Sequence, residues 1–169
     1  METTVRFSTR YLVRAALIAA VYVALTYVAG VMNLAYGPVQ FRFSEALTVL
    51  PFLLPEAVPG LFVGCVVSNL ISPYGALDLV VGSFATLLAA FWTGKCRRRY
   101  LAPLPPVVCN AALVGAMIAW YETGFGAGFP LAFAYNALTV GAGEAAVCYL
   151  LGLPLLRILE NRVVARNKT

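Results

Sequence analysis

The first apolar run of the chain, residues 11–31, reads YLVRAALIAAVYVALTYVAGV. A helix needs about 20 mainly apolar residues to cross a bilayer. This run is long enough, and its one charged residue is Arg14, near the start. No A-x-A cleavage site closes the run and more apolar sequence follows, so it is typical of a retained spanning helix rather than a signal peptide. The stretch therefore predicts a membrane protein.

Five more apolar segments follow, at 45–55, 57–71, 77–93, 104–121 and 130–156. Six spans of about 20 residues use most of the 169 residues and leave no room for a separate soluble domain. The second and third segments are short and are bracketed by Pro51, Pro55 and Pro59, which predicts tilted or partial spans. We expect an all-α integral membrane protein of six transmembrane helices, with residues 1–169 forming one domain.

Composition agrees with this class and excludes several activities. The chain is 62% hydrophobic and 11% charged, whereas a soluble domain has about 45–50% and about 25%. It has no histidine and no G-x-x-x-x-G-K-[ST] motif, which argues against zinc-protease or Ser-His-Asp chemistry and against ATP hydrolysis by this chain. The isolated cysteines predict neither disulfides nor a metal site: Cys65, Cys96, Cys109 and Cys148. We expect no cofactor, no metal and no catalytic residue.

The basic residues predict the orientation. Short loops rich in Lys and Arg stay in the cytoplasm. With six spans, 11 of the 12 basic residues fall on one side: Arg6, Arg10, Arg14, Lys95, Arg97, Arg98, Arg99, Arg157, Arg162, Arg166 and Lys168. This topology explains the net charge of +5 without a nucleic-acid partner. Both the N-terminal tail (1–10) and the C-terminal tail (157–169) are predicted to be cytoplasmic.

Acidic residues at membrane depth are costly and usually mark a ligand or ion path. Glu45 and Asp78 open two predicted spans from the outside, and Glu144 lies near the middle of the last span. These three acids are predicted to reach a common outward-facing space. Glu56, between the second and third segments, is expected to be a solvated or capping residue at the inner side.

The connection at about 32–44 is a candidate binding lid. It combines Tyr36, Gln40, Arg42 and Phe43 in a short outer loop, and Ser44 is suited to cap the next helix. The alternative is an interfacial aromatic belt in which Arg42 pairs with a lipid phosphate or with Glu45.

The last segment carries Asn136, Val140 and Glu144 at i, i+4 and i+8, and hence on one face. A carboxylate beside aromatic rings suits an amino-substituted, purine-like base, because it accepts two N–H bonds while a ring stacks on the base. In the alternative interpretation, Glu144 bonds Asn110 or Asn69 and holds helices together.

Small residues form two stripes on the first helix, Ala16-Ala20-Ala24 and Ala15-Ala19. Such stripes allow close helix packing, either inside the chain or against a partner protein. Gly60-x-x-x-Gly64 is a weaker case and is expected to pack internally.

Taken together, these residues resemble the QueT group of queuosine-precursor transporters, which are substrate-binding (S) components of energy-coupling factor transporters. The resemblance is carried by QFRFSEALTVLP (40–51), GLFVGCVVSN (60–69), DLVVGSFATLLAA (78–90), LPPVVCN (104–110) and GAGEAAVCYLLGLP (141–154). It implies a six-helix bundle in a prokaryotic plasma membrane, with an outward pocket closed by the loop after the first helix. It also implies a transmembrane T component that docks on Ala-x-x-x-Ala, and two cytoplasmic ATPases.

The ligand class implied by the resemblance is queuine or prequeuosine-type 7-deazaguanines. On this basis Glu144 or Glu45 is assigned to the guanine-like N–H edge. The other assignments are hydrogen bonding for Asp78, Asn69, Asn110 and Asn136, lid closure for Arg42 and Gln40, and stacking for Tyr36 or Phe43. One competing hypothesis is a self-sufficient proton-coupled carrier that uses Glu144. Another is a membrane enzyme using Glu45, Asp78 and Glu144, which lacks a nucleophile and metal-ligand spacing.

Overall fold

The computed structural model describes residues 8–35 and 40–166, and across these ranges the chain is helical with no strand. The elements are α1 (Thr9–Val31), η1 (Phe43–Phe52), α2 (Ala57–Asn69), η2 (Asp78–Gly82), α3 (Ser83–Thr93), η3 (Arg99–Leu101), α4 (Leu104–Cys109), η4 (Asn110–Val114), α5 (Gly115–Thr123), α6 (Phe129–Val147), η5 (Cys148–Gly152) and α7 (Leu153–Arg166). Of these, η1 and η3 are 3-10 helices, and η2, η4 and η5 are π turns within longer helices.

Joined through their π turns, the elements form six main helical segments close to the predicted boundaries. Three helices are long and apolar enough to cross a membrane: Thr9–Val31, Arg99–Thr123 and Phe129–Asn161. The shorter apolar helices are Phe43–Phe52, Ala57–Asn69 and Asp78–Thr93. The prediction of an all-helical chain of membrane-protein character is confirmed.

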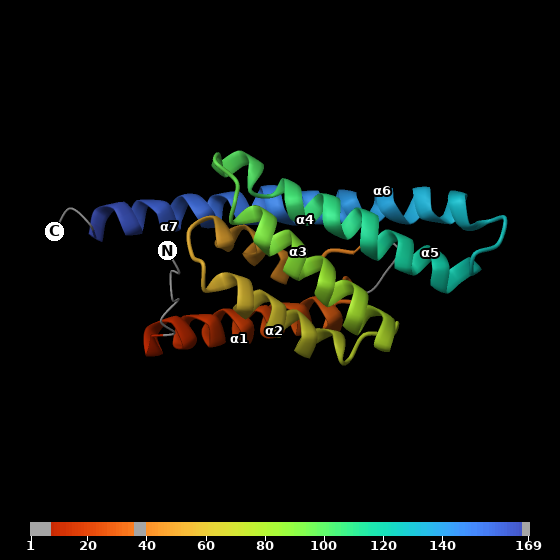
Figure 1. Cartoon of the computed structure of the whole chain (residues 1–169), viewed down its shortest axis with the longest axis horizontal. Coiled ribbons are helices and arrows are strands. Elements are labelled where there is room, and N and C mark those ends of the chain that lie inside the picture. The colour runs from red at the N-terminus through yellow and green to blue at the C-terminus, as the bar shows by residue number, and fades with distance from the viewer. Residues whose placement is uncertain (1–7, 36–39, 167–169) are drawn as a thin grey trace, which may run out of the picture.

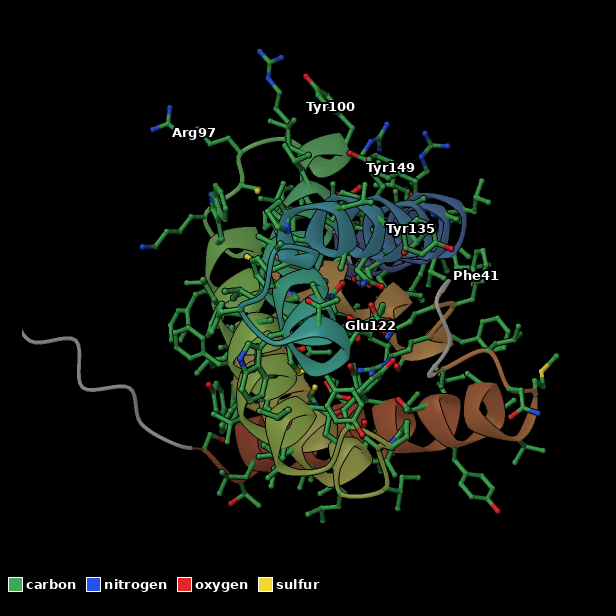
Figure 2. The ribbon with its side chains drawn as sticks, turned by 90° about the vertical axis from the view of Figure 1, so that its right-hand side faces the viewer. Phe41, Arg97, Tyr100, Glu122, Tyr135 and Tyr149 are labelled. Atoms are coloured by element: carbon green, nitrogen blue, oxygen red, sulfur yellow. The ribbon has the colours of Figure 1, made fainter. Side chains whose placement is uncertain are left out.

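Successive segments run in opposite directions along the bundle (Figure 1). The beginning of α1, the connection after α3 and the end of α7 lie at one end, which we call the basic end. Its exposed cations are Arg10, Arg14, Lys95, Arg97, Arg98, Arg99 and Arg157. Figure 2 shows Arg97 and Tyr100 pointing away from the bundle. Arg6 and Lys168, and the side chains of Arg162 and Arg166, lie outside the described part of the chain.

Helices α1 and α2 pack closely because glycines on α2 remove side chains from the contact. A Cβ atom on Gly60 would come within 2.6 Å of the Ala15 carbonyl oxygen, and one on Gly64 within 2.9 Å of the Tyr22 Cβ. The internal role predicted for Gly60 and Gly64 is therefore confirmed. Ala15 is buried and Ala19 half-buried, and both lie in this internal contact.

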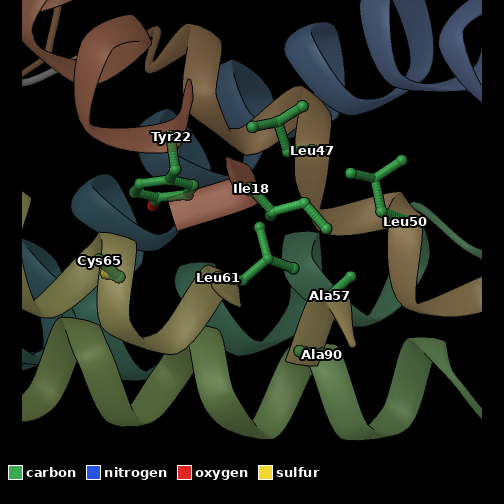
Figure 3. Close-up of a cluster of buried hydrophobic side chains, with 8 residues drawn as sticks. All are labelled: Ile18, Tyr22, Leu47, Leu50, Ala57, Leu61, Cys65 and Ala90. Atoms are coloured by element: carbon green, nitrogen blue, oxygen red, sulfur yellow. The ribbon is translucent and has the colours of Figure 1, made fainter. Parts of the chain in front are cut away.

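A core cluster joins α1, η1, α2 and α3 (Figure 3), and η1 lies inside it. Every residue from Ser44 to Pro51 is buried. The second segment is therefore surrounded by other helices, and its ten residues extend about 20 Å at the rise of a 3-10 helix. The predicted cap by Ser44 is wrong: Arg42 occupies the cap position, and the Ser44 hydroxyl accepts a bond from Thr26 at 2.8 Å.

Glu56 occupies the N-cap position of α2, as expected for a capping residue, but its side chain makes no capping bond. It is 6% exposed rather than solvated, and it pairs with Arg14 at 2.8 Å. The reason is that α1 starts beside the beginning of α2, which brings a cation of the first segment onto this carboxylate.

Candidate functional site

A small enclosed cavity lies between the segment before η1 and the helices η1, α3, η4 and α6. Its volume is about 10 Å³, which is room for about one water molecule. It is lined by Gln40, Arg42, Glu45, Gly82, Thr86, Asn110, Val114, Val140 and Glu144. Polar and charged groups dominate this lining, in contrast to the apolar core around it.

Glu45 is held at the cavity by α1 and by its own helix. It is 2% exposed, and Oε1 accepts a hydrogen bond of 2.5 Å from the Tyr22 hydroxyl. Oε2 has no hydrogen-bond partner among the described residues. One carboxylate oxygen is thus fixed and the other is left as an acceptor.

Glu144 faces the same cavity from the middle of α6 and is 7% exposed. Its carboxyl group is hydrogen-bonded to Asn110, and the Cys148 thiol lies 3.5 Å from Oε1. The Glu45 and Glu144 carboxyls are close enough to interact directly. The interhelical contact with Asn110 is therefore present, and it lies in the wall of the cavity.

Arg42 connects the segment before η1 to the start of η2. Its Nη2 donates to Asp78 Oδ2 at 3.0 Å, its Nε to the Ala35 carbonyl at 3.0 Å, and its Nη1 to Asn69 Oδ1 at 3.4 Å. Burial disfavours the charged guanidinium, but the Asp78 carboxylate outweighs this cost, so the pKa of Arg42 lies above its ordinary value. The ion pair that the structure gives Arg42 is with Asp78.

Asp78 is fully buried and accepts hydrogen bonds from several neighbours. Ser72 donates to its Oδ2 at 2.7 Å, and Asn69 donates to its backbone carbonyl at 2.9 Å. Oδ1 has no partner within the described chain and points toward Gly82, a lining residue. Asp78 and Asn69 therefore support Arg42 at the wall of the cavity.

The segment at Gln40 is seated directly on α6. A Cβ atom on Gly143 would collide with the Gln40 carbonyl oxygen, so the missing side chain is what allows this contact. Gln40 is 7% exposed, and its Nε2 has no partner in the described ranges. Gln40 and Arg42 of this segment form part of the cavity lining.

Two predicted ligand residues, Asn136 and Phe43, do not line the cavity. Asn136 is held by Glu122, whose Oε2 accepts its amide at 2.9 Å, and Glu122 lies at the bundle end facing the viewer in Figure 2. Phe43 is half-buried at the start of η1 and does not line the cavity. Tyr36 lies outside the described residues.

Sequence reasoning missed Tyr22 and Thr86. Tyr22 is completely buried and donates to Glu45, and Thr86 lines the cavity from α3. A hydroxyl in the middle of an apolar run was the available signal, since a buried polar group needs a partner.

A larger groove of about 530 Å³ lies nearer the basic end and is apolar. It is lined by Tyr11, Pro51, Pro55, Val58, Pro59, Phe62, Leu87, Phe91, Gly94 and Lys95. A small-molecule site needs convergent polar groups, which the enclosed cavity has and this groove lacks. No cluster of three metal-ligating side chains occurs in the described chain.

The two alanine stripes of α1 face different surroundings. Ala15 and Ala19 contact α2, whereas Ala16, Ala20 and Ala24 are exposed. Of the two stripes, the one formed by Ala16, Ala20 and Ala24 is therefore the more accessible to a partner.

Comparison with known proteins gives one family. The chain matches the family described as QueT transporter over residues 12–161. It is 38% identical over 77 residues to the queuosine precursor transporter QueT of Lactococcus lactis subsp. cremoris (strain MG1363). The alignment covers 46% of this chain and 45% of the relative, so the chain spans about half the length of the curated relative it matches. No solved structure matches the chain.

Proposed function

The chain belongs to the QueT transporter family, and from this membership we propose that it is the membrane-embedded substrate-binding component of an ATP-driven importer of queuosine precursors. In this proposal it is an S component of an energy-coupling factor transporter in a prokaryotic plasma membrane. It takes up queuine or a prequeuosine-type 7-deazaguanine from outside. A transmembrane T component and two cytoplasmic ATPases supply the coupling, and the chain itself catalyses no reaction.

One observation carries the proposal: a closed, polar cavity inside an apolar helical bundle. The carboxylates of Glu45 and Glu144 and the amides of Gln40 and Asn110 converge on it. A 7-deazaguanine offers adjacent ring and exocyclic N–H donors, which a carboxylate accepts in pairs. With room for about one water, the cavity is too small for a bicyclic base, so binding requires the segment at Gln40 and Arg42 to move outward.

Calorimetric titration of the purified chain with queuine tests this function, with guanine and riboflavin as control ligands. We expect tight, selective binding that Glu144→Gln weakens by about 100-fold or more, since removing one partner of a buried charged hydrogen bond costs about 3 kcal/mol. Glu160→Gln, a change at the basic end, is the matched control and retains the wild-type affinity. Absence of binding to every 7-deazaguanine contradicts the proposal.

The topology in this proposal has six spans with the basic end in the cytoplasm. The exposed cations gathered at that end support it. Cys96 is the accessible thiol there, whereas Cys65, Cys109 and Cys148 are buried. A membrane-impermeant maleimide should label Cys96 in inside-out vesicles and not in intact cells. Labelling in intact cells contradicts this orientation.

The partner surface in this proposal is the exposed stripe of Ala16, Ala20 and Ala24. Small side chains allow another helix to approach closely, and a bulky one blocks it. We expect Ala20→Trp to abolish co-purification with the T component without changing ligand affinity. Leu138→Trp, on the exposed face of α6, is the control and retains the complex. Normal complex formation by Ala20→Trp removes this assignment.

The buried carboxyl pair favours a second candidate, a proton-coupled carrier that works without partners. In that case Glu144 binds a proton and the substrate alternately. Vesicles holding the purified chain alone distinguish the two functions. Uptake driven by a pH gradient, and lost in Glu144→Gln, identifies the carrier; binding without uptake identifies the substrate-binding component.

A further inference from the structure

The charges around the cavity do not balance. Arg42 is the cation in its lining, and its ion pair is with Asp78 at 3.0 Å. Glu45 and Glu144 face the cavity as well, so two carboxyl groups remain after the Arg42–Asp78 pair is counted. If both were ionised, the empty site would carry about two negative charges inside an apolar bundle.

Two carboxylates buried side by side repel each other and lose their hydration, so they need a proton or a cation between them. Without a bound cation this role falls to a proton, because no second cationic side chain lines the cavity among the described residues. A ligand that brings its own positive charge can take the place of that proton.

The buried polar atoms without hydrogen-bond partners support the same conclusion. Asp78 Oδ1 is an acceptor without a partner in the described chain, and the neighbour of Glu45 Oε2 is another acceptor group, the Glu144 carboxyl; both side chains are more than nine-tenths buried. The matching unpartnered donor is Gln40 Nε2. Buried acceptors are normally satisfied, so the surplus of carboxylate oxygens calls for a ligand rich in N–H donors.

We propose that this site selects its ligand as a cation, namely a 7-deazaguanine whose side arm carries a protonated amine. The inference rests on the proposed function and adds a charge requirement to it. When the ammonium arrives, the proton shared by Glu45 and Glu144 leaves for the solvent; the ammonium then pairs with one of the two carboxylates, and the other accepts the N–H edge of the base. The other titratable groups around the pair are Tyr22 from α1, Cys65 from α2, Asp78 from η2, Cys109 from α4, Cys148 from η5, and Arg42.

The test compares two ligands that share one bicyclic base: 7-aminomethyl-7-deazaguanine, a cation near neutral pH, and the uncharged 7-cyano-7-deazaguanine. Calorimetric titration of the full chain gives both affinities. Repeating it in phosphate and in Tris, whose ionisation enthalpies differ, gives the number of protons released. We expect the cation to bind at least 30-fold more tightly and to release about one proton, while the nitrile releases none.

Variants locate the charge requirement. In Glu45→Gln and in Glu144→Gln, the preference for the amine over the nitrile should fall below about threefold, and the proton release should disappear. Glu160→Gln keeps both. The two-ligand comparison on the unaltered chain decides the question even where a variant does not fold.

Each outcome has a separate meaning. Equal affinities for the two ligands without proton release overturn the charge requirement and leave the proposed function standing. Failure of both ligands to bind overturns the proposed function itself. Tighter binding of the nitrile also overturns the charge requirement.

Discussion

Removing the charge of Asp78 tests whether the ion pair at the cavity wall holds the bundle together. Asp78→Asn keeps the size of the side chain and one acceptor oxygen but removes the ion-pair partner of Arg42. Arg42 is 7% exposed and Asp78 is fully buried, so solvent cannot compensate. Breaking a buried pair by neutralising one partner costs about 3–5 kcal/mol. Because Asn still accepts a hydrogen bond, we expect a loss near the lower bound, about 3 kcal/mol.

The Arg99–Glu160 pair is a matched control. Its atoms are 3.5 Å apart and its side chains are 51% and 25% exposed. A pair of this kind contributes about 1 kcal/mol or less. The double variant Arg42→Gln with Asp78→Asn removes both charges and should cost less than Asp78→Asn alone.

The measurement is reversible unfolding of the purified chain in mixed micelles, followed by circular dichroism as the denaturing detergent is increased. The free energy of unfolding should fall in the order wild type, Arg99→Gln, double variant, Asp78→Asn. A loss in Asp78→Asn no greater than that in Arg99→Gln would refute the reasoning, because the buried pair would then behave as a surface pair.

Three further outcomes follow from the packing and from the loop thiol. Gly143→Ala places a methyl group against the Gln40 carbonyl and should weaken ligand binding about tenfold or more, measured by titration; an unchanged affinity contradicts the seating of that segment on α6. Gly64→Val forces α1 from α2 and should lower the free energy of unfolding by about 1–3 kcal/mol, whereas Gly128→Ala, with its nearest contact at 3.7 Å, should change it by less than about 0.5 kcal/mol. Burial raises the pKa of the Cys96 thiol, so maleimide labelling should keep accelerating above pH 9; a rate that levels off below this pH contradicts the shift.

The helical segments were predictable because long apolar runs interrupted by proline, glycine and charge determine them locally. The form of η1 was not, since neither its 3-10 winding nor the burial of residues Ser44 to Pro51 follows from the local sequence. Both depend on the five other segments that surround it.

The acids of the site were predictable from the cost of placing a carboxylate at membrane depth, and the structure brings Glu45 and Glu144 to one cavity. Their partners were not predictable, because Arg42 meets Asp78 across 36 residues and Tyr22 meets Glu45 across 23. Asn136 shares a helix face with Glu144 but is eight residues away, about 12 Å along the axis, where its neighbour is Glu122. A shared face does not imply a shared depth.

The two alanine stripes of α1 are limited in side-chain size by different things. At Ala15 and Ala19 the limit comes from within the chain, because α2 packs closely there and a larger residue is expected to disturb folding. At Ala16, Ala20 and Ala24 the fold imposes no such limit, since these positions are exposed. Any selection that keeps them small acts through something outside the chain. One helix can therefore change what it associates with while its own fold is inherited unaltered.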